Sequence, residues 1–437
     1  MFREARSHRF AWSLSLFVVL AGALVASPVA AGAGSPVPLT DEFRADHAQP
    51  SKTWQYAPHA IALGGGRTAV IWEQDLDGIF ARFLDATGAP EGGDRRLVGS
   101  AGLRAPFRGV TNLRRHPSAQ ALPDGGFLLA WTEERTFITS SAFYERRNVL
   151  DRDVMVQRFA SDGTPASDRS LINAARAGEQ SYPQLVRRGE GGFAAVWRTV
   201  DADSPERQGI YLRAIAGTGT PQGTEVRVDS GLDSEPGVPS VAFNTAGAAL
   251  VAWDACCDAG GDRGVFARAI GTDLAPASAV FRVNATAAHA QTWPAVAVSL
   301  DGEFLVAWQS VTGVQQSRYG QRRVRGQLVG SDGGLLGPEL LLSSGEGWGH
   351  DTPRLSAGTD GSLLLTWLVF DGDFPAGIAA ARLAGDGERT SDAAWVSESR
   401  TIGSPASVHA GEGRYLVTWL GVLAKKRSVA ARFVGLE

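Results

Sequence analysis

A pattern of 15 residues, built from apolar and turn-forming positions, recurs seven times along the chain. Each copy places a proline, then a glycine and finally a tryptophan at fixed spacing, as in Pro294, Gly302 and Trp308. Alternating apolar and polar residues after the proline predict a strand with one buried face. The glycine, often preceded by aspartate, supplies the positive φ of a tight hairpin. The apolar run 304–308, which ends at the tryptophan, predicts a second strand that is buried on both faces.

The tryptophan of this repeat unit is present in every copy. The seven residues are Trp72, Trp131, Trp197, Trp253, Trp308, Trp367 and Trp419. Because an aromatic ring that recurs in all copies serves the fold common to them, we expect each indole to pack in the core between neighbouring units.

Two further strands are predicted after each tryptophan, as in residues 210–213 and 224–229 of the third unit. The first of them repeats one polar residue, which is Arg82, Arg158, Arg213, Arg268, Gln327, Arg382 and Arg432 in turn. We expect these side chains to be structural, bracing a turn or stacking on an aromatic ring. Helical periodicity is absent from the chain after residue 31.

Four short strands in each of seven units predict an all-β fold, a seven-bladed β-propeller with four-stranded blades in a single domain over residues 34–437. The last unit ends after three strands. Residues 39–46 resemble the fourth strand of the third unit, 224–229. We therefore predict that the N-terminal strand pairs beside residues 428–433 and completes the last blade, which removes an exposed sheet edge.

These residues also support a resemblance to a known kind of repeat. Gln291 and Pro294, Asp301-Gly302, Gln157-Arg158-Phe159 and the Gly-x-Pro at 163–165 together resemble a repeat of about fifty residues found in bacterial secreted and surface proteins. The resemblance covers nearly the whole chain after residue 31. It implies a propeller architecture and no defined activity.

The first 31 residues predict a secretory signal. Arg3, Arg6 and Arg9 precede an apolar run over 12–24, and small residues follow it up to position 31. The run is shorter than the roughly 20 residues that cross a bilayer, so we expect no membrane span. The predicted product is secreted, periplasmic or extracellular, and monomeric.

Charge and cysteine content narrow the possible partners. The chain has 437 residues with 42 basic and 46 acidic side chains, so its net charge of −4 gives no electrostatic case for nucleic acid. The only cysteines, Cys256 and Cys257, are adjacent. They predict a vicinal disulfide that braces a loop, with a redox or ligand-contact role as the alternative.

Function is expected on the face where the loops after each tryptophan meet the segments before each proline. Acidic and aromatic residues that break the repeat gather there, and the longest loop spans 132–153. The candidate ligand-binding residues are His116, Glu133, Tyr144, Tyr182, Asp254, Trp293, Trp348, His350 and Asp351.

Paired acids on this face raise the question of a metal. Asp75 with Asp77, and Asp371 with Asp373, could hold calcium, although neither pair continues into a full twelve-residue calcium loop and solvated turn acids are the favoured interpretation. No other cofactor is expected. Gly-x-Ser-x-Gly nucleophile motifs and phosphate-binding loops are absent.

The leading hypothesis is an exported, non-enzymatic scaffold that binds a glycan, a peptide or a surface protein through this face. The alternative is a glycan-active hydrolase or lyase of sialidase-like shape, since two carboxyl groups across a sugar suffice for hydrolysis. The Ser-x-Asp-x-Gly-x-x-Trp box of sialidases is absent. Whether the protein is an enzyme stays open at this level, with the absence of a catalytic constellation favouring binding.

Overall fold

The structure is a computed structural model. It describes residues 35–46, 55–100, 107–140, 145–176, 178–189, 192–201, 203–232, 234–256, 262–286, 289–312, 321–343, 348–372, 374–423 and 426–436. The predicted signal at residues 1–31 and the candidate residues Tyr144, Cys257 and Asp373 lie outside these ranges.

The described residues form antiparallel sheets, as the alternating pattern predicts. Four of the sheets are meanders of four consecutive strands. They are β3 (Gln55–Ala62), β4 (Thr68–Gln74), β5 (Gly78–Leu84) and β6 (Arg95–Gly99); β15 (Ser240–Phe243), β16 (Ala249–Ala255), β17 (Gly264–Ile270) and β18 (Phe281–Arg282); β19 (Gln291–Val298), β20 (Phe304–Thr312), β21 (Gln321–Val329) and β22 (Leu335–Leu341); and β23 (Trp348–Ala357), β24 (Leu363–Asp371), β25 (Phe374–Leu383) and β26 (Ala394–Trp395).

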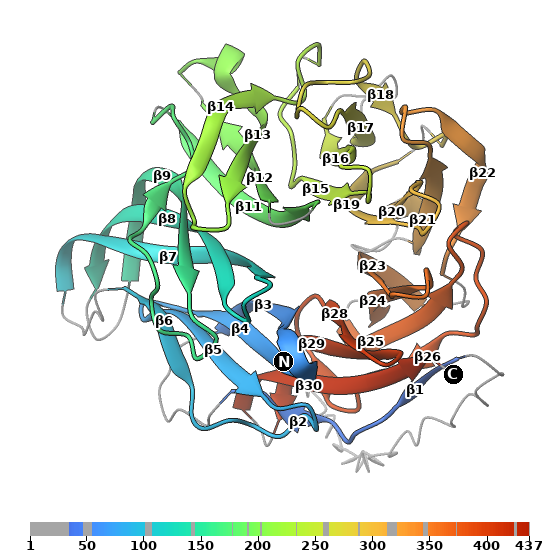
Figure 1. Cartoon of the computed structure of the whole chain (residues 1–437), viewed down its shortest axis with the longest axis horizontal. Helices are drawn as coiled ribbons and strands as arrows, with labels where there is room; N and C mark the ends of the chain where they lie inside the picture. Colours follow the sequence, from blue (N-terminus) through green and yellow to red (C-terminus); the bar gives the residue numbers. More distant parts are fainter. Residues whose placement is uncertain are drawn as a thin grey trace, which may run out of the picture. The chain divides into compact units, whose positions relative to one another are not determined.

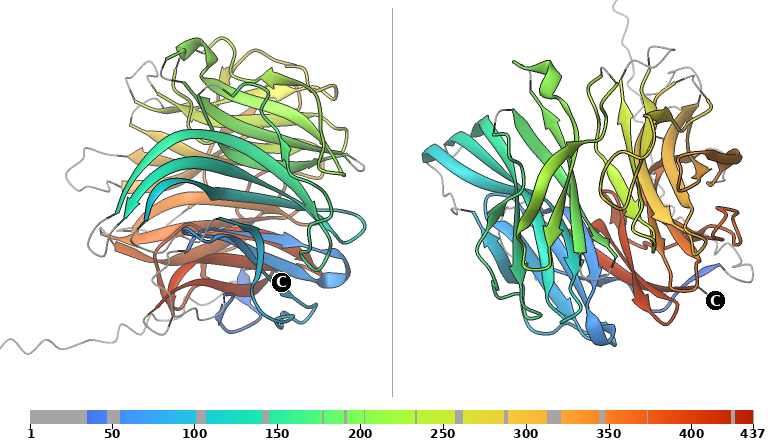
Figure 2. Two further views of the ribbon diagram at one scale, coloured as in Figure 1. Left: turned by 90° about the vertical axis from the view of Figure 1, so that its left-hand side faces the viewer. Right: turned by 45° about the horizontal axis from the view of Figure 1, so that its top comes forward.

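A larger sheet joins two such meanders through a parallel bridge between β9 and β11. Its strands are β7 (Phe107–Ala121), β8 (Phe127–Ser140), β9 (Glu145–Phe159), β10 (Ser170–Leu171), β11 (Glu179–Arg188), β12 (Gly192–Val200), β13 (Gly209–Ala216) and β14 (Pro221–Arg227). The strands β7, β8 and β9, teal in the left view of Figure 2, continue well past the hairpin core. Their outer halves form an arm next to the site described below.

The last sheet contains strands from the N-terminal segment and from the seventh unit. Its strands are β1 (Pro36–Pro38), β2 (Phe43–Arg44), β27 (Arg400–Thr401), β28 (Ala406–Gly411), β29 (Arg414–Leu423) and β30 (Lys426–Leu436). Two single 3-10 turns, η1 (Gly64–Gly66) and η2 (Pro205–Arg207), complete the described elements. Along the described ranges no helix is long and apolar enough to cross a membrane. The expected all-β class is confirmed.

The seven tryptophans of the repeat are the centres of the hydrophobic core. Each is at most 1% exposed, and each lies in a separate cluster of buried residues. Trp131, for example, packs with Ile71 and Phe83 of the preceding sheet. Trp72 of the first unit packs with Leu416 of the last sheet, and Figure 1 shows these sheets side by side in blue and red. The predicted packing of tryptophan between neighbouring units is confirmed.

The repeated arginine of the third strand braces backbone carbonyls. Arg213 donates to the carbonyl of Gly223 at 3.0 Å and to that of Ile172, in the preceding unit, at 2.6 Å. Arg268 donates in the same way to the carbonyl of Val228 at 2.9 Å. Since these arginines join the outer edges of successive sheets, their predicted structural role is confirmed.

The N-terminal segment pairs with the last strand, as the resemblance between 39–46 and 224–229 predicts. Phe43 lies opposite Ala431 in the antiparallel pairing of β2 with β30. Beyond β2, the buried carboxylate of Asp46 accepts the backbone N–H of Val429 at 3.0 Å. In another sheet Asn284, which follows the fourth strand β18, accepts the backbone N–H of Val265 in the same way. The N-terminal segment therefore makes the contact that a fourth strand makes in that sheet.

The proline of each unit marks a break in the first strand. In β3, β7, β11, β19 and β23 the register shifts at the proline, a β-bulge in each case. The residue before the proline has a positive φ in four of them, at His116, Tyr182, Trp293 and Thr352. Six of the prolines line one cavity of about 470 Å³, called here the proline-lined cavity: Pro58, Pro117, Pro183, Pro239, Pro294 and Pro405. Three of the left-handed residues, His116, Tyr182 and Trp293, line this same cavity.

Candidate functional site

A second cavity, of about 410 Å³, lies beside the proline-lined cavity and is called here the charged cavity. The two share Tyr56, His116 and Tyr182. The charged cavity is lined by Tyr56, Glu73, Arg115, His116, Glu134, Arg147, Val149, Arg152, Tyr182 and Arg198. These residues come from β3, β4, β7, β8, β9, β11 and β12, so the site combines the strand ends that the sequence placed on one face.

Strand alternation explains which side chains enter the charged cavity. Positions one and three after the core tryptophan lie on the same side of the strand, because side chains alternate with a period of two. Glu73 and Arg198 directly follow Trp72 and Trp197, and Glu134 is the third residue after Trp131. Residues at even offsets face away.

Three carboxylates surround one guanidinium group in the charged cavity. Arg115 forms an ion pair with Glu73, and the same nitrogen lies 3.4 Å from Asp75 Oδ1. Arg115 Nε lies 3.9 Å from Glu134 Oε1. Glu73 is only 3% exposed, and its burial raises the pKa of this carboxyl group against the opposing charge of Arg115.

The arm formed by β8 and β9 supplies two more arginines. Arg147 binds Asp75 through both guanidinium nitrogens at 3.0 and 2.7 Å. Arg152 donates from Nε to Glu134 at 2.9 Å and also pairs with Glu179. The arm is thus tied to the neighbouring sheet by charge-assisted hydrogen bonds.

Two aromatic rings separate the charged cavity from the proline-lined cavity. The rings of His116 and Tyr182 stack with centroids 3.8 Å apart, and the guanidinium of Arg198 lies 5.3 Å from the Tyr182 centroid. Burial, followed by the positive charges of Arg115, Arg152 and Arg198, lowers the pKa of His116 to about 3. The imidazole is therefore neutral at physiological pH.

A hydrogen bond between successive units holds the residue before the proline in its left-handed conformation. Glu73 accepts the backbone N–H of His116 at 3.2 Å, and Thr132 Oγ1 accepts that of Tyr182 at 3.2 Å. Asp254 receives the backbone N–H of Trp293 in the same arrangement. The accepting side chain directly follows the core tryptophan in each case, so this position has a structural task in these units.

The structure brings some of the predicted ligand-binding residues together. His116 and Tyr182 line both cavities, and Trp293, 41% exposed, lines the proline-lined cavity. Asp254 lies behind Trp293 and is paired with Arg263 at 2.6 Å. Burial raises the pKa of Asp254, and Arg263 opposes this effect.

Other predicted residues lie elsewhere. Glu133 faces the opposite side of β8 from Glu134, and Asn112 Nδ2 donates to it at 3.0 Å. His350 packs against Trp367 in the core at a centroid distance of 5.8 Å. Trp348 and Asp351 belong to β23, and Asp351 lines neither cavity.

The predicted metal ligands do not form one cluster. Asp75 is bound by Arg147, Asp77 accepts from Gln74 at 2.9 Å, and Asp371 ends β24. Among the described side chains there is no group of three or more histidines, cysteines or acids arranged to hold a metal ion. Calcium binding stays a prediction, and Asp373 of the second pair lies outside the described ranges. The disulfide also stays a prediction, because Cys257 lies outside them.

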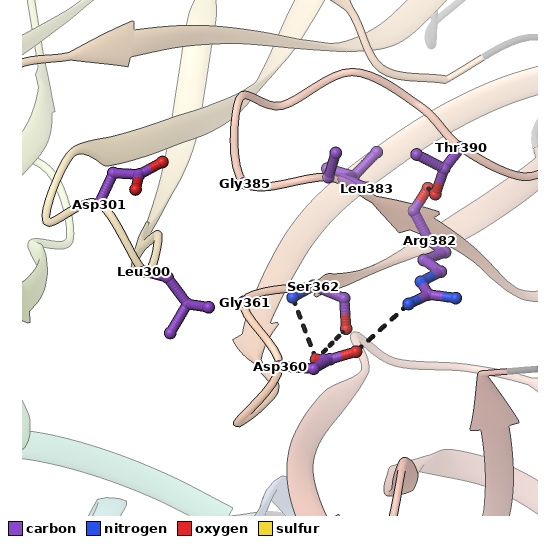
Figure 3. Close-up of a pocket in the computed structure, with 10 residues that line it drawn as sticks. Leu300, Asp301, Asp360, Gly361, Ser362, Arg382, Leu383, Gly385 and Thr390 are labelled. Atoms are coloured by element: carbon purple, nitrogen blue, oxygen red, sulfur yellow. Dashed lines mark hydrogen bonds and ion pairs between the residues drawn. The ribbon is translucent and has the colours of Figure 1, made fainter.

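A third cavity, of about 670 Å³, lies at the hairpin turns of two neighbouring sheets (Figure 3). Two of its charged groups bind one another, because Asp360 pairs with Arg382 at 3.2 Å; Asp360 also accepts from the Ser362 hydroxyl at 2.6 Å. The same pairing of turn aspartate and third-strand arginine occurs between Asp124 and Arg158. Since the pair recurs between units, we assign it to the fold.

Sequence reasoning missed the charged lining of the site. Glu73, Arg115 and Arg198 were not among the candidate residues, although Glu73 and Arg198 directly follow core tryptophans. The period of two along each strand is the signal that would have selected them. Arg147 and Arg152 reach the cavity through the extended arm, whose course no local pattern indicates.

Comparison with known proteins shows a fold and no family. No family model matches the chain, and no curated protein is similar to it in sequence. A protein of unknown function from Dyadobacter fermentans is 13% identical, with a TM-score of 0.52, over 76% of this chain and 96% of its own. An α-L-arabinofuranosidase from Fusarium graminearum is 11% identical, with a TM-score of 0.44, over 92% and 98% of the two chains. A sialidase from Streptococcus pneumoniae is 9% identical, with a TM-score of 0.49, over 77% and 68%.

These comparisons correct the leading hypothesis. The leading hypothesis is a non-enzymatic binding scaffold, whereas the enzymes named among the similar structures are glycan hydrolases. At these identities the likeness itself shows the fold alone. The chain therefore has a propeller-like all-β fold.

Proposed function

We propose that the protein is a glycan-active hydrolase and that hydrolysis takes place in the charged cavity. The observation that carries this proposal is the approach of Glu73 and Glu134 to one guanidinium group, that of Arg115. Two carboxyl groups about 5–10 Å apart are the usual machinery for cleaving a glycosidic bond, one as acid and one as base or nucleophile.

The environments of the two carboxyl groups suggest their roles. Glu73 is the proposed acid, because its burial raises its pKa and favours the protonated form. Glu134 is the proposed base, because it lines the cavity and accepts hydrogen bonds from Thr136 and Arg152. Asp75 is bound through both carboxylate oxygens by Arg147 and does not line the cavity.

The proposed reaction consumes one water molecule. Glu73 gives its proton to the glycosidic oxygen, which takes the electron pair of the breaking C–O bond. Glu134 removes a proton from water, and the water oxygen forms the new bond to the anomeric carbon. The proton then returns from Glu134 to Glu73 through solvent. Tyr182 and Trp293 offer aromatic faces on which sugar rings can stack.

The same proposal includes the finer architecture that the sequence predicts. We propose seven blades in a closed arrangement, supported by seven hydrophobic clusters, one centred on the tryptophan of each unit. One of these clusters joins β28–β30 to β3–β5. Glu42 in the N-terminal segment supports closure, because it accepts the backbone N–H groups of Glu398 and Ser399 at 2.7 and 2.8 Å. Export and a monomeric state remain part of the proposal on the sequence alone.

Release of reducing ends from a panel of neutral and acidic oligosaccharides tests the activity. We expect Glu73→Gln and Glu134→Gln each to lower kcat/KM by about 10²–10⁴-fold. Glu133→Gln is the matched control, because this neighbouring side chain faces away from the cavity, and we expect it to retain activity. Failure of the wild type to cleave any member, or full activity of both cavity variants, would refute the proposal.

A further inference from the structure

Arg198 differs from the other arginines whose ion pairs tie the charged cavity together. Its guanidinium lines the cavity, and within the described ranges no carboxylate forms an ion pair with it. Its Nε is buried and has no hydrogen-bond partner there. A charged donor group that lacks an acceptor is unfavourable in the free protein, so a ligand whose oxygen atoms reach this guanidinium is favoured.

The repeat shows that Arg198 is not required by the fold. The residue directly after the core tryptophan accepts the next unit's backbone N–H where it is Glu73, Thr132 or Asp254. Arginine is only a donor and cannot make this contact. In the following unit the residue before the proline, Val238, has no positive φ that such a contact would stabilise. In the third unit the residue after the core tryptophan therefore does not form the hydrogen bond that stabilises the next unit's backbone.

The surroundings fix the guanidinium for recognition. Tyr182 covers one face of it at 5.3 Å, and His116 stacks behind Tyr182. This cation–π contact holds the plane of the group and leaves its N–H edge available to a ligand in the cavity. Arg115 and Arg152 line the same cavity as Arg198. Burial first, and then the positive charges of these three arginines, lower the pKa of His116.

We propose that Arg198 binds an anionic substituent of the sugar in the charged cavity, so that the substrates are acidic glycans. This inference rests on the proposed hydrolase function and adds its substrate class. Guanidinium groups bind carboxylates and sulfate-like oxyanions through two parallel hydrogen bonds. A uronic acid carboxylate and a sulfate ester share this chemistry, and the experiment distinguishes them.

Matched pairs of oligosaccharides test the substrate class. One arm compares uronic acid oligomers with their methyl esters, and the other compares sulfated oligosaccharides with desulfated ones. Binding is measured by calorimetry on Glu73→Gln, which prevents turnover, and kcat/KM is measured on the wild type. We expect at least one acidic member to bind about 10–100-fold more tightly than its neutral partner.

Variants of Arg198 assign this preference to one residue. Arg198→Gln should abolish the 10–100-fold preference, and Arg198→Lys should retain part of it, because a charge without the planar fork remains. Arg135→Gln is the control, since its side chain is 54% exposed, pairs with Asp151 and lies outside both cavities. Unchanged melting temperatures for the variants would show that folding is not the cause.

The outcomes separate the two proposals. Equal binding of acidic and neutral members, binding of no acidic member, or an unchanged preference in Arg198→Gln would overturn the inference about substrate class. Hydrolysis of neutral glycans that does not depend on Arg198 would overturn it while leaving the hydrolase function intact. Binding of acidic glycans without any hydrolysis would instead support the recognition role and overturn the hydrolase function.

Discussion

The buried carboxylate of Asp46 connects the N-terminal segment to the last strand. Its side chain is fully shielded from solvent. Oδ1 accepts the backbone N–H of Val429 at 3.0 Å and Arg44 Nε at 3.1 Å, and Oδ2 accepts from Gln55. Replacing Asp46 by alanine removes all of these acceptors at once.

The expected loss of stability follows from the groups left behind. Asp46→Ala leaves the Val429 N–H and the Gln55 amide without an acceptor and breaks the pairing with Arg44. A buried unsatisfied group costs about 1–3 kcal/mol, and a broken buried ion pair about 3–5 kcal/mol. Because Arg44 is partly exposed and regains water, we expect a total of about 3 kcal/mol in the free energy of unfolding.

Asp46→Asn is the matched control, because its Oδ1 can still accept the Val429 N–H. Asn284 makes this contact to Val265 at 2.8 Å in another sheet. We expect the asparagine variant to lose about 1 kcal/mol, mainly through the weaker interaction with Arg44. Urea unfolding followed by tryptophan fluorescence measures both changes. Equal stability of the two variants, or no change in either, would show that Asp46 does not anchor the segment.

Three further predictions concern closure, the core and pH. Deleting residues 34–48 should lower the melting temperature and produce oligomers in size-exclusion chromatography, whereas trimming to Gly34 should do neither; a silent deletion would refute closure. Trp253→Ala should cost about 3–5 kcal/mol in urea unfolding, and an unchanged midpoint would refute the core assignment. Burial lowers the pKa of His350 from 6.5 to about 4, so between these pH values the His350 imidazole is protonated in the unfolded chain and neutral in the folded protein. The free energy of unfolding should therefore fall by about 3 kcal/mol as pH drops from 6.5 to 4. His350→Asn should flatten this pH dependence, and an unaltered slope would contradict the assignment.

Features repeated in every unit could be predicted from the sequence, because each copy confirms the others. The core position of Trp131 and the bracing role of Arg213 follow from recurrence alone. The pairing of β2 with β30 could be predicted because 39–46 carries the pattern of a fourth strand. These contacts depend on local spacing and on the packing of like units, which a sequence records directly.

The site could be predicted only in its location. His116 and Tyr182 were expected on the functional face and do line the cavities. The sequence places both Glu133 and Glu134 on this face, and only Glu134 lines the charged cavity, because neighbouring residues point to opposite sides of a strand. Arg198 was missed because its significance lies in the absence of a partner, which depends on the folded arrangement of residues far apart in the chain.

The bulge before each proline has a consequence for how this protein can change. At His116 and Tyr182 the left-handed conformation is held through the backbone N–H, a contact that does not depend on the identity of the side chain. The chain places histidine, tyrosine, tryptophan and threonine at this one backbone position in different units. A new specificity could therefore arise by exchanging single side chains around the cavities while the scaffold stays intact, which makes these positions natural targets for a combinatorial library.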